Sequence, residues 1–545
     1  MKKLVFLFPL LMLAACGGGS SSNPVPDQQS TSPTPPPVPT PPPVPTPPPA
    51  PSAVFSVASG TAAAVSAVGG ASTVTVNLTH QGNLSGQIYA NVNDSANVMQ
   101  PAVSVVANKD NTHTVSISTA ANIAAGRYKG TLTLNVCNDA ACSSAVSGSP
   151  FQVPYDISIT PEWQMFQGNA AHTAYVPLTL DPTAFKARWS WKSPSNYYSY
   201  IVPASGVVTG NGNVYFNAGL QMMALREVDG TLAWNTDFST VSSTINPPTI
   251  SDGKLYVMAN MFSNSGNNAS LIVMNANSGA ILAKSSAVSQ TQNFMPPTVS
   301  NGVVFSNWAG NGLSAFDGGT AAQKYFTTLQ ASDMWTPAVD ANSVYAYNSG
   351  TYSYVNGSYV SSPALFSIVD RSTGAVKLSL TDPYATSSYY YVNSLRAAPV
   401  IGATNSVFLV SSNANGGSNL SNINVSAGKW NWSIPGRYSN NPGYANGVVY
   451  AMNSLPLQIE ARAETDGKLL WSWSPLSSAE NSFNSDVLLT DSHVFVSTNV
   501  NTYAIDLKTH QFAWVYPMSG RLSLSANGVL YICTFDNKLA AVALK

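Results

Sequence analysis

Residues 446–450 read Asn-Gly-Val-Val-Tyr, and residues 466–471 read Asp-Gly-Lys-Leu-Leu-Trp. Each stretch begins with a turn dipeptide and continues into apolar residues, which is the signal of a β-hairpin. Together the two stretches read as one unit: a turn, a strand, a second turn, and a strand that ends in Trp. This unit decides the fold because the chain repeats it.

The first half of the unit recurs about eight times, mostly at intervals of about 36 to 49 residues with one of about 63, which is the period range of propeller blades. The copies begin at Asn211, Asp252, Asn301, Ala341, Thr404, Asn446, Asp491 and Asn527. The second half keeps its Trp at residues 229–234, 428–432 and 510–514, and loses it at 278–282 and 373–378. A blade cannot bury both faces alone, so its strands must pack on the next blade. We therefore predict that the repeated Trp wedges between neighbouring blades and needs one partner for its indole N–H.

Over residues 163–545, these motifs resemble the pyrroloquinoline-quinone-type repeat family of β-propellers. The motifs identify a fold and not an activity. Residues 163–173 (WQMFQGNAAHT) resemble the opening segment of the same family. Residues 185–189 have the Trp spacing of a second half but no first half before them, while the last first half is followed only by residues 538–544. We therefore predict an eight-bladed β-propeller over residues 161–545, closed by pairing an N-terminal strand with C-terminal strands, which hides the edge strands.

The start of the chain has the features of a bacterial lipoprotein. Residues 1–3 are a basic n-region, and the apolar run from residue 4 to residue 12 is too short to span a bilayer. The Leu-Ala-Ala-Cys sequence that ends at Cys16 resembles the lipobox, in which the Cys becomes the lipid-modified first residue. The alternative is an ordinary cleavage site with a chance Cys. We predict a signal peptide at 1–15 and lipidation of Cys16, with the outer membrane favoured because Gly17 is not the Asp that retains lipoproteins at the inner membrane in that family.

Two further segments precede the propeller. Residues 16–52 are rich in Gly, Ser and Pro, and the Pro repeats predict a semi-rigid polyproline II tether, with a ligand for a proline-recognition domain as the alternative. Residues 53–160 alternate apolar and polar residues over 72–78 and 113–117, as half-buried strands do. With the strands expected at 126–134 and 151–157, this segment resembles a bacterial immunoglobulin-like β-sandwich. The complete fold prediction is all-β, a β-sandwich followed by the propeller.

The four cysteines indicate an oxidising compartment. Cys137 and Cys142 flank a turn-like segment between two strands, so we predict a disulfide between them. Metal binding would need more Cys or His nearby, and none is adjacent. Cys533 lies in an apolar strand and is expected to be a buried, inert thiol.

Several function classes find no support in the sequence. Charged residues are 9% of the chain and the formal net charge is −1, so there is no electrostatic footprint for nucleic acid. No nucleophile elbow, phosphate loop or zinc signature is present, and His172 is expected to be a structural group rather than a base. The resemblance implies that some relatives hold pyrroloquinoline quinone over the ring axis, with a disulfide between adjacent cysteines, a Ca²⁺ ion and an Asp base. This chain has no adjacent Cys pair, so we predict no enzyme activity, no cofactor and no metal.

The remaining hypothesis is a binding surface. Tyr is clustered with Ser, Gly and Asn, a recognition mixture that supplies rigid aromatic area at low entropy cost. The candidate ligand-binding residues are Tyr197, Tyr198, Tyr200, Tyr352, Tyr354, Tyr359, Tyr389, Tyr390 and Tyr391. The alternative for these loops is solvated turns whose Tyr packs on the rim.

The sequence thus predicts a non-catalytic cell-envelope lipoprotein. It would be held at the membrane by its lipid, and its propeller would bind an envelope protein or a glycan. The alternatives are a quinone-dependent oxidoreductase and a surface adhesin. The outer-membrane assembly lipoprotein family resembles this chain in its lipid anchor and eight-bladed propeller, but lacks the Pro-rich tether and the immunoglobulin-like domain. That resemblance implies an interaction scaffold and leaves the assembly role open.

Overall fold

The computed structural model describes residues 52–58, 60–68, 70–120, 123–193, 206–261, 268–291, 295–308, 312–330, 335–348, 352–385, 398–403, 405–413, 416–536 and 538–545. Over these residues the chain is β-structured, with a single short 3-10 helix η1 (Pro182–Ala184). No helix within them is long and apolar enough to cross a membrane. The predicted signal peptide, Cys16 and nearly all of the tether lie outside the described residues.

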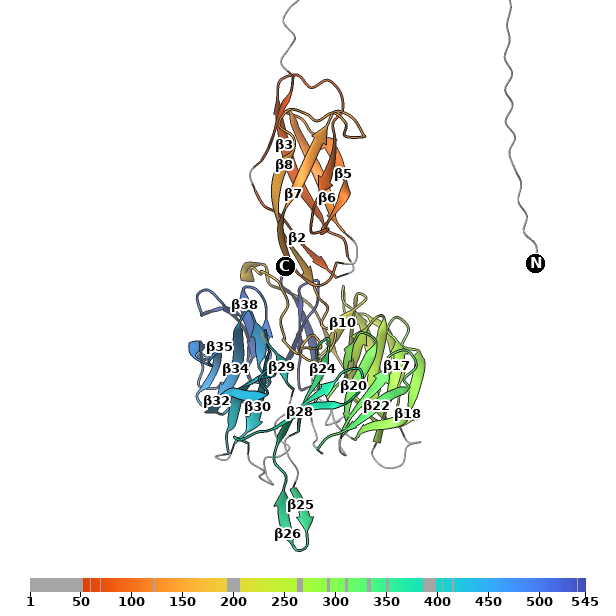
Figure 1. Cartoon of the computed structure of the whole chain (residues 1–545), viewed down its shortest axis with the longest axis vertical. Coiled ribbons are helices and arrows are strands. Elements are labelled where there is room, and N and C mark those ends of the chain that lie inside the picture. Colours follow the sequence, from red (N-terminus) through yellow and green to blue (C-terminus); the bar gives the residue numbers. More distant parts are fainter. Residues whose placement is uncertain are drawn as a thin grey trace, which may run out of the picture. The chain divides into compact units, whose positions relative to one another are not determined.

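Residues 52–160 form an eight-stranded sheet in the order β1-β3-β6-β5-β4-β7-β8-β2 (Figure 1). Its strands are β1 (Val54–Val57), β2 (Ala62–Ala67), β3 (Thr73–Gln81), β4 (Tyr89–Asn93), β5 (Met99–Ala107), β6 (Thr112–Thr119), β7 (Gly126–Cys137) and β8 (Phe151–Thr160). β2 runs parallel to β8, so the sheet is mixed. β4 and β5 are joined through one residue pair, Asn91 with Ala102, and the buried apolar faces of β3, β6, β7 and β8 share one core. The predicted strands are confirmed, whereas the immunoglobulin-like assignment stays a prediction for this single curled sheet.

The predicted disulfide is confirmed. Cys137, the last residue of β7, is bonded to Cys142, and their Cα atoms lie 5.1 Å apart. Cys533 is a free, buried thiol, as expected.

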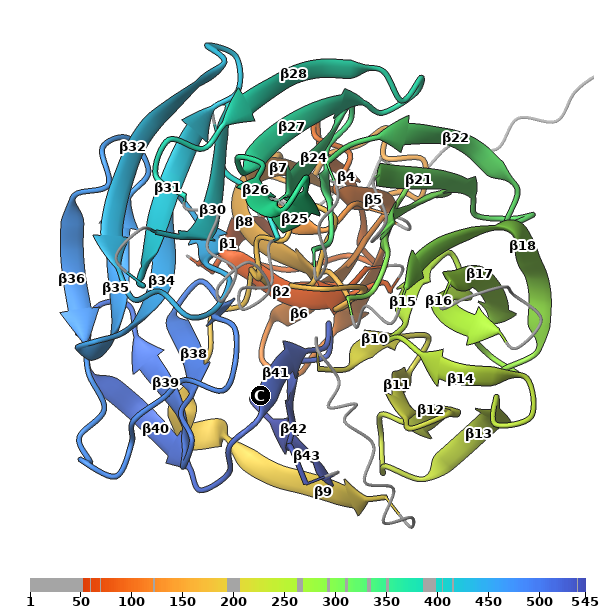
Figure 2. The ribbon, with the colours of Figure 1, turned by 90° about the horizontal axis from the view of Figure 1, so that it is seen from below.

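The rest of the chain forms eight sheets arranged in a ring, which confirms the eight-bladed propeller (Figure 2). We number the blades 1 to 8 along the chain and name the strands of each blade A to D from the ring axis to the rim. In blade 2, β14 (Ser242–Ile245) and β15 (Thr249–Ser251) both pair with strand B, and β15 is strand A. Blades 1 to 4 comprise, in turn, β10 (Val208–Gly210), β11 (Asn213–Ala218), β12 (Gln221–Arg226) and β13 (Leu232–Asp237); β14 (Ser242–Ile245), β15 (Thr249–Ser251), β16 (Lys254–Met261), β17 (Asn268–Asn275) and β18 (Ile281–Thr291); β19 (Thr298–Ser300), β20 (Val303–Trp308), β21 (Gly312–Asp317) and β22 (Gln323–Thr328); and β23 (Ala338–Val339), β24 (Ser343–Asn348), β27 (Leu365–Asp370) and β28 (Val376–Thr381).

Blades 5 to 8 comprise, in turn, β29 (Val400–Ile401), β30 (Ser406–Ser412), β31 (Ser418–Asn424) and β32 (Lys429–Gly436); β33 (Gly443–Ala445), β34 (Val448–Ser454), β35 (Leu457–Ala463) and β36 (Leu469–Trp473); β37 (Leu488–Leu489), β38 (His493–Ser497), β39 (Thr502–Asp506) and β40 (Phe512–Tyr516); and β41 (Arg521–Leu524), β42 (Val529–Cys533), β43 (Lys538–Ala543) and β9 (Lys186–Lys192). β9 pairs antiparallel with β43, Trp189 opposite Ala541. The predicted closure by an N-terminal strand is therefore confirmed.

The two repeated turns occupy fixed places in each blade. The Asn-Gly or Asp-Gly of the first half joins strands A and B; in blade 1 the φ angles of Asn211 and Gly212 are 52° and 71°. Two successive positive φ angles define the type I′ hairpin turn, which explains the Asn-Gly preference. The Asp-Gly of the second half joins strands C and D, so Trp lies on the rim strand.

Where the Trp residues are present they contact the following blade, as predicted. In three blades the indole Nε1 donates a hydrogen bond of 2.9 Å to a backbone carbonyl of the following blade: Trp189 to Glu227, Trp234 to Ala276 and Trp432 to Glu464. The same rings lie against the C–D turn glycine of that next blade. A Cβ added to Gly230 would come within 2.6 Å of the Trp189 ring, and one added to Gly279 within 2.4 Å of the Trp234 ring. In these two blades the turn glycine therefore meets both demands, a positive φ and this close approach, whereas blade 7 has His510 here, with a φ of 59° and its ring stacked on Trp471.

The strand C residue opposite the Trp position is small where an aromatic side chain is present and larger where it is absent. Cα partners are Ala224–Trp234, Ala461–Trp471, Ala504–Trp514 and Ala541–Trp189, and Ala315 faces Tyr325 in blade 3. Where the ring is absent the partner is larger, Ile368 opposite Leu378 and Val273 opposite Ala283. A small residue thus makes room for the indole, as close packing requires.

Blade 5 departs from this pattern, because Asn422 faces Trp432. Asn422 is fully buried, and neither its amide nitrogen nor its carbonyl oxygen has a hydrogen-bond partner. A buried polar group without a partner costs about 1–3 kcal/mol.

We expect Asn422→Ala to raise the free energy of unfolding by about 1–2 kcal/mol, because it removes this unpaired amide and restores the Ala–Trp pair of the other blades. Urea denaturation of the two chains measures the difference. The matched control is Ala461→Asn, which should lower the stability by a similar amount. A destabilised Asn422→Ala chain would show instead that the amide stabilises the folded blade.

Residues 163–178, here called the axial segment, run along the innermost strands of the ring. Backbone carbonyls of this segment accept hydrogen bonds from the strand A amides of six blades, at Thr209, Ile250, Val339, Ile401, Tyr444 and Leu489, over distances of 2.7 to 2.9 Å. Trp163, Met165, Phe166, Val176 and Leu178 of the segment are buried. The axial segment therefore covers the inner edges that strand A would otherwise expose.

Candidate functional site

His172 of the axial segment is a structural group, as the sequence suggested. Its Nδ1 donates to the carbonyl oxygen of Pro399 at 3.1 Å, and its Nε2 lies 3.3 Å from Thr298 Oγ1. Because a carbonyl oxygen only accepts, the proton of the neutral ring is on Nδ1. Burial lowers the pKa of His172 to about 4, so the imidazole is neutral at physiological pH and ties blades 3 and 5 to the axis.

The strand order places two kinds of connection at each end of the blades. Since neighbouring strands are antiparallel, A–B and C–D turns share one face of the ring, and B–C and D–A connections share the other, here called the B–C face. Residues 193–207 join strand D of blade 8 to strand A of blade 1, and residues 382–399 join blade 4 to blade 5. The Tyr cluster at residues 352–359 therefore belongs to a connection of the B–C face.

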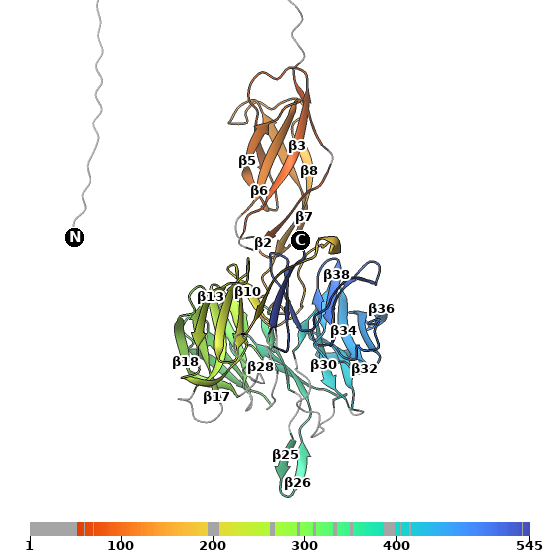
Figure 3. The same ribbon diagram turned by 180° about the vertical axis from the view of Figure 1, so that it is seen from behind.

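Blade 4 carries the one Tyr cluster that the structure describes. β25 (Tyr352–Val355) and β26 (Ser358–Ser361) form a two-stranded hairpin inserted between strands B and C of this blade. Its register pairs Tyr354 with Tyr359, and Tyr352 with Ser361. The hairpin projects from the ring, as the two opposite views show (Figures 1 and 3). Tyr197, Tyr198, Tyr200, Tyr389, Tyr390 and Tyr391 lie outside the described residues, so their predicted role stays a prediction.

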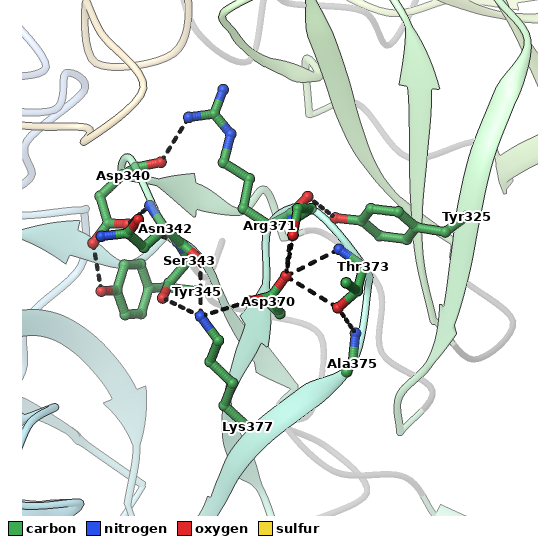
Figure 4. Close-up of polar contacts among 11 residues, drawn as sticks. Tyr325, Asp340, Asn342, Ser343, Tyr345, Asp370, Arg371, Thr373, Ala375 and Lys377 are labelled. Carbon is green, nitrogen blue, oxygen red and sulfur yellow. Dashed lines mark hydrogen bonds and ion pairs between the residues drawn. The ribbon is translucent and has the colours of Figure 1, made fainter.

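A polar cluster on the opposite face joins blade 4 to blade 3 (Figure 4). Tyr325, at the Trp position of blade 3, donates its hydroxyl to the carbonyl of Arg371 at 3.0 Å. The guanidinium of Arg371 donates to the carbonyls of Ser300 at 2.7 Å and Asp340 at 3.0 Å. The sequence motifs did not predict this cluster. The features that could have indicated it are the Tyr in place of Trp at residue 325 and the Arg before the turn at residue 371.

Lys377 and Asp370 form the second half of this cluster. The ammonium of Lys377 lies 2.9 Å from an Asp370 carboxylate oxygen and 2.9 Å from the carbonyl oxygen of Asn342. Hydrogen bonds from the Ser372 hydroxyl and from Lys377 hold the pKa of Asp370 well below its usual range. Each charge therefore has a partner within the cluster, and the arrangement clamps blades rather than supplying a free base or nucleophile.

A groove of about 510 Å³ opens beside this cluster, between blades 4 and 5. Tyr345 and Leu378 line it from blade 4, and Val425 and Gly428 line it from the C–D turn of blade 5. The Tyr345 hydroxyl donates to Asp340 at 2.7 Å, which fixes the ring against the groove wall.

The fold family implies pyrroloquinoline quinone, but the residues that the structure describes do not fit that group. The bonded pair, Cys137 and Cys142, is five residues apart in the N-terminal sheet. Cys533 is buried in β42, where burial raises the pKa of its thiol to about 12. Across the described part of the chain, no three His, Cys, Asp or Glu side chains lie together as a metal-ligand set. We therefore derive no chemical step through a quinone.

Comparison with known proteins supports the assignment of the repeated motifs to a propeller family. A family model described as outer membrane protein assembly factor BamB matches residues 179–282 and 259–473. No curated protein gives a significant match. Among solved structures, BamB from Moraxella catarrhalis is 13% identical with a TM-score of 0.48, covering 66% of this chain and 98% of that one.

Two further solved structures have similar sequence identities and TM-scores. A europium-containing methanol dehydrogenase is 13% identical with a TM-score of 0.48, covering 68% of this chain and 89% of that one. The computationally designed Ika8 protein is 12% identical with a TM-score of 0.47, covering 62% of this chain and 95% of that one. We draw no functional conclusion from similarities at this level.

Proposed function

We propose that this chain is a non-catalytic binding scaffold of the cell envelope. It belongs to the PQQ-type repeat family whose model is described as outer membrane protein assembly factor BamB. The lipobox ending at Cys16 and the Pro-rich tether support a protein held at the outer membrane by a lipid. The proposed ligand is another envelope protein, which the propeller holds through blades 4 and 5.

One observation carries this proposal: blade 4 departs from the repeat on the B–C face. Its B–C connection is extended by the β25–β26 hairpin, whose sequence holds Tyr352, Tyr354 and Tyr359. The connection to blade 5 that follows holds Tyr389, Tyr390 and Tyr391. A two-stranded hairpin gains little stability on its own, so an inserted hairpin is better explained by binding than by folding.

Replacing Tyr352, Tyr354 and Tyr359 together by Ser should weaken partner capture by about thirtyfold, since truncating an aromatic anchor costs ~2 kcal/mol or more. The melting temperature should stay nearly unchanged, because an inserted hairpin contributes little to the ring. The measurement is quantitative crosslinking and capture with lipidated full-length protein from membranes.

The matched control replaces exposed apolar residues on the same face of other blades. Leu455, Leu476 and Val500 belong to connections of blades 6 and 7 and are 65%, 75% and 42% exposed. Their triple Ser variant should keep full capture. Equal capture by both variants would contradict the proposal, and loss of a glycan rather than a protein from the Tyr variant would assign the site to carbohydrate.

A further inference from the structure

The β25–β26 hairpin is a sheet of its own, separate from the sheet of blade 4 (Figure 1). Asn356 and Gly357 at its tip have φ angles of 51° and 83°, so they form a two-residue type I′ turn. Within the described part of the chain, no third strand pairs with either edge of this hairpin. Because a two-stranded hairpin alone is only marginally stable in water, a third strand would stabilise it.

The register of the hairpin decides which backbone groups face outward. The two-residue turn closes between Val355 and Ser358, so these two residues exchange both of their backbone hydrogen bonds. The next pair, Tyr354 with Tyr359, is then a non-hydrogen-bonded pair. The N–H and C=O groups of Tyr352 and Tyr354 therefore lie on the free edge of β25, and those of Tyr359 lie on the edge of β26.

The hairpin has no charged residue to protect these edges. No Asp, Glu, Lys, Arg or His occurs from residue 341 to residue 369. By contrast, five of the eight rim strands contain Lys, at residues 186, 284, 324, 377 and 429. Lys and Pro are the residues by which natural proteins prevent another chain from pairing with an exposed strand.

The two edges of the hairpin differ at its base. Just beyond β26, Pro363 has no N–H to donate, and its carbonyl already accepts a hydrogen bond of 2.8 Å from the side chain of Gln330. The same Gln330 nitrogen donates to Ser362 Oγ at 2.7 Å. A Pro limits pairing along the strand that it adjoins. The four residues of β25 include neither Pro nor a charge, so β25 presents the more open edge.

We propose that a partner polypeptide adds an extended segment to the free edge of β25, as the third strand of the hairpin sheet. The main-chain groups of Tyr352 and Tyr354 pair with this segment, which matches the four-residue length of β25. The segment is uncharged, because the hairpin offers no charge to pair with a buried one. The inference rests on the proposed binding function and names its mode, in which main-chain hydrogen bonds supply affinity and side chains supply specificity.

The test compares Pro with Ser at Tyr354 and at Tyr359, in four single variants of the lipidated full-length protein. Because the two residues form one non-hydrogen-bonded pair, Pro at either position removes an outward N–H and no bond within the hairpin. We expect Tyr354→Pro to capture the partner about tenfold more weakly than Tyr354→Ser, since a partner carbonyl loses its donor. Tyr359→Pro and Tyr359→Ser should capture the partner equally.

Equal Pro-to-Ser ratios at the two positions would overturn the inference, and so would a larger ratio at residue 359 or capture of a glycan. Hydrogen exchange gives a second readout. On capture of the partner, the amides of Tyr352 and Tyr354 should exchange more slowly, whereas those of Ser353 and Val355, already bonded within the hairpin, should change little. Protection that does not alternate in this way would also contradict strand addition.

The Pro-to-Ser ratio separates this inference from the proposed function. Both variants at one position lack the same Tyr ring, so the ratio reports only the backbone N–H. The Ser variants alone report the contribution of the Tyr side chains. Reduced capture by the Ser variants with equal ratios would therefore leave the proposed function in place and remove strand addition.

Discussion

Gly230→Ala should be among the most destabilising single changes in the ring, lowering the free energy of unfolding by about 3–5 kcal/mol. The added Cβ would lie 2.6 Å from the ring of Trp189, so the indole must move. Movement breaks its hydrogen bond to the Glu227 carbonyl, and a buried group left without its partner costs about 1–3 kcal/mol. Since Trp189 belongs to β9, the strand that completes blade 8, the change loosens the interface between blades 8 and 1.

Gly212→Ala separates this effect from backbone strain. Gly212 and Gly230 have φ angles of 71° and 72°, so Ala meets the same left-handed conformation at both positions. A Cβ on Gly212 would meet nothing within 4 Å. We expect Gly212→Ala to cost only about 1–2 kcal/mol in urea denaturation, the strain term alone. Equal losses at the two positions would show that the Trp–Gly contact does not hold the ring closed.

Acid should destabilise the propeller through His172. The pKa of this ring is 6.5 in an unfolded chain and about 4 in the folded one, because burial disfavours the charged imidazolium. The unfolded chain therefore binds the proton more readily, and stability is full above pH 6.5 and is lost as the pH falls from 6.5 toward 4. The loss amounts to about 3 kcal/mol for this group.

His172→Gln tests the assignment, because the amide can donate to the Pro399 carbonyl but does not titrate. We expect this variant to be less stable than the native chain at pH 7.5, since it loses the edge-to-face contact with Phe166, and to lose less stability between pH 6.5 and 4. The control is His113→Gln in the N-terminal sheet, which should keep the acid sensitivity of the propeller. An unchanged pH profile in His172→Gln would assign the acid transition to other groups.

Most of the fold could be predicted from the repeated motifs. The Asn-Gly and Asp-Gly turns have a local backbone cause, so blade number, strand order and closure by β9 followed from their spacing. The Trp locks were also predictable, because a ring that large must be buried against a neighbour.

The axial segment and the blade 4–blade 5 groove were not predictable in the same way. Six strand A amides reach residues 163–174 only once the ring exists, and nothing local in that sequence shows its path. The groove is lined by Leu378 of blade 4 and by the C–D turn of blade 5, about 50 residues later, so no local stretch of sequence shows it. The repeats could have predicted the pairing of small residues with Trp, and this pairing would have identified Asn422 as an exception.

Site-specific photo-crosslinking around the ring tests the central claim, that blades 4 and 5 hold the partner. Leu455, Leu476 and Val500 lie in connections of the same face in blades 6 and 7, and all three are exposed. A photoreactive residue would be placed at each of these and at Ser358 of the hairpin, and the yield of partner crosslinks would be measured in intact cells. We predict that the yield is concentrated at Ser358. Equal yields around the ring, or a maximum at Leu455, Leu476 or Val500, would contradict the account.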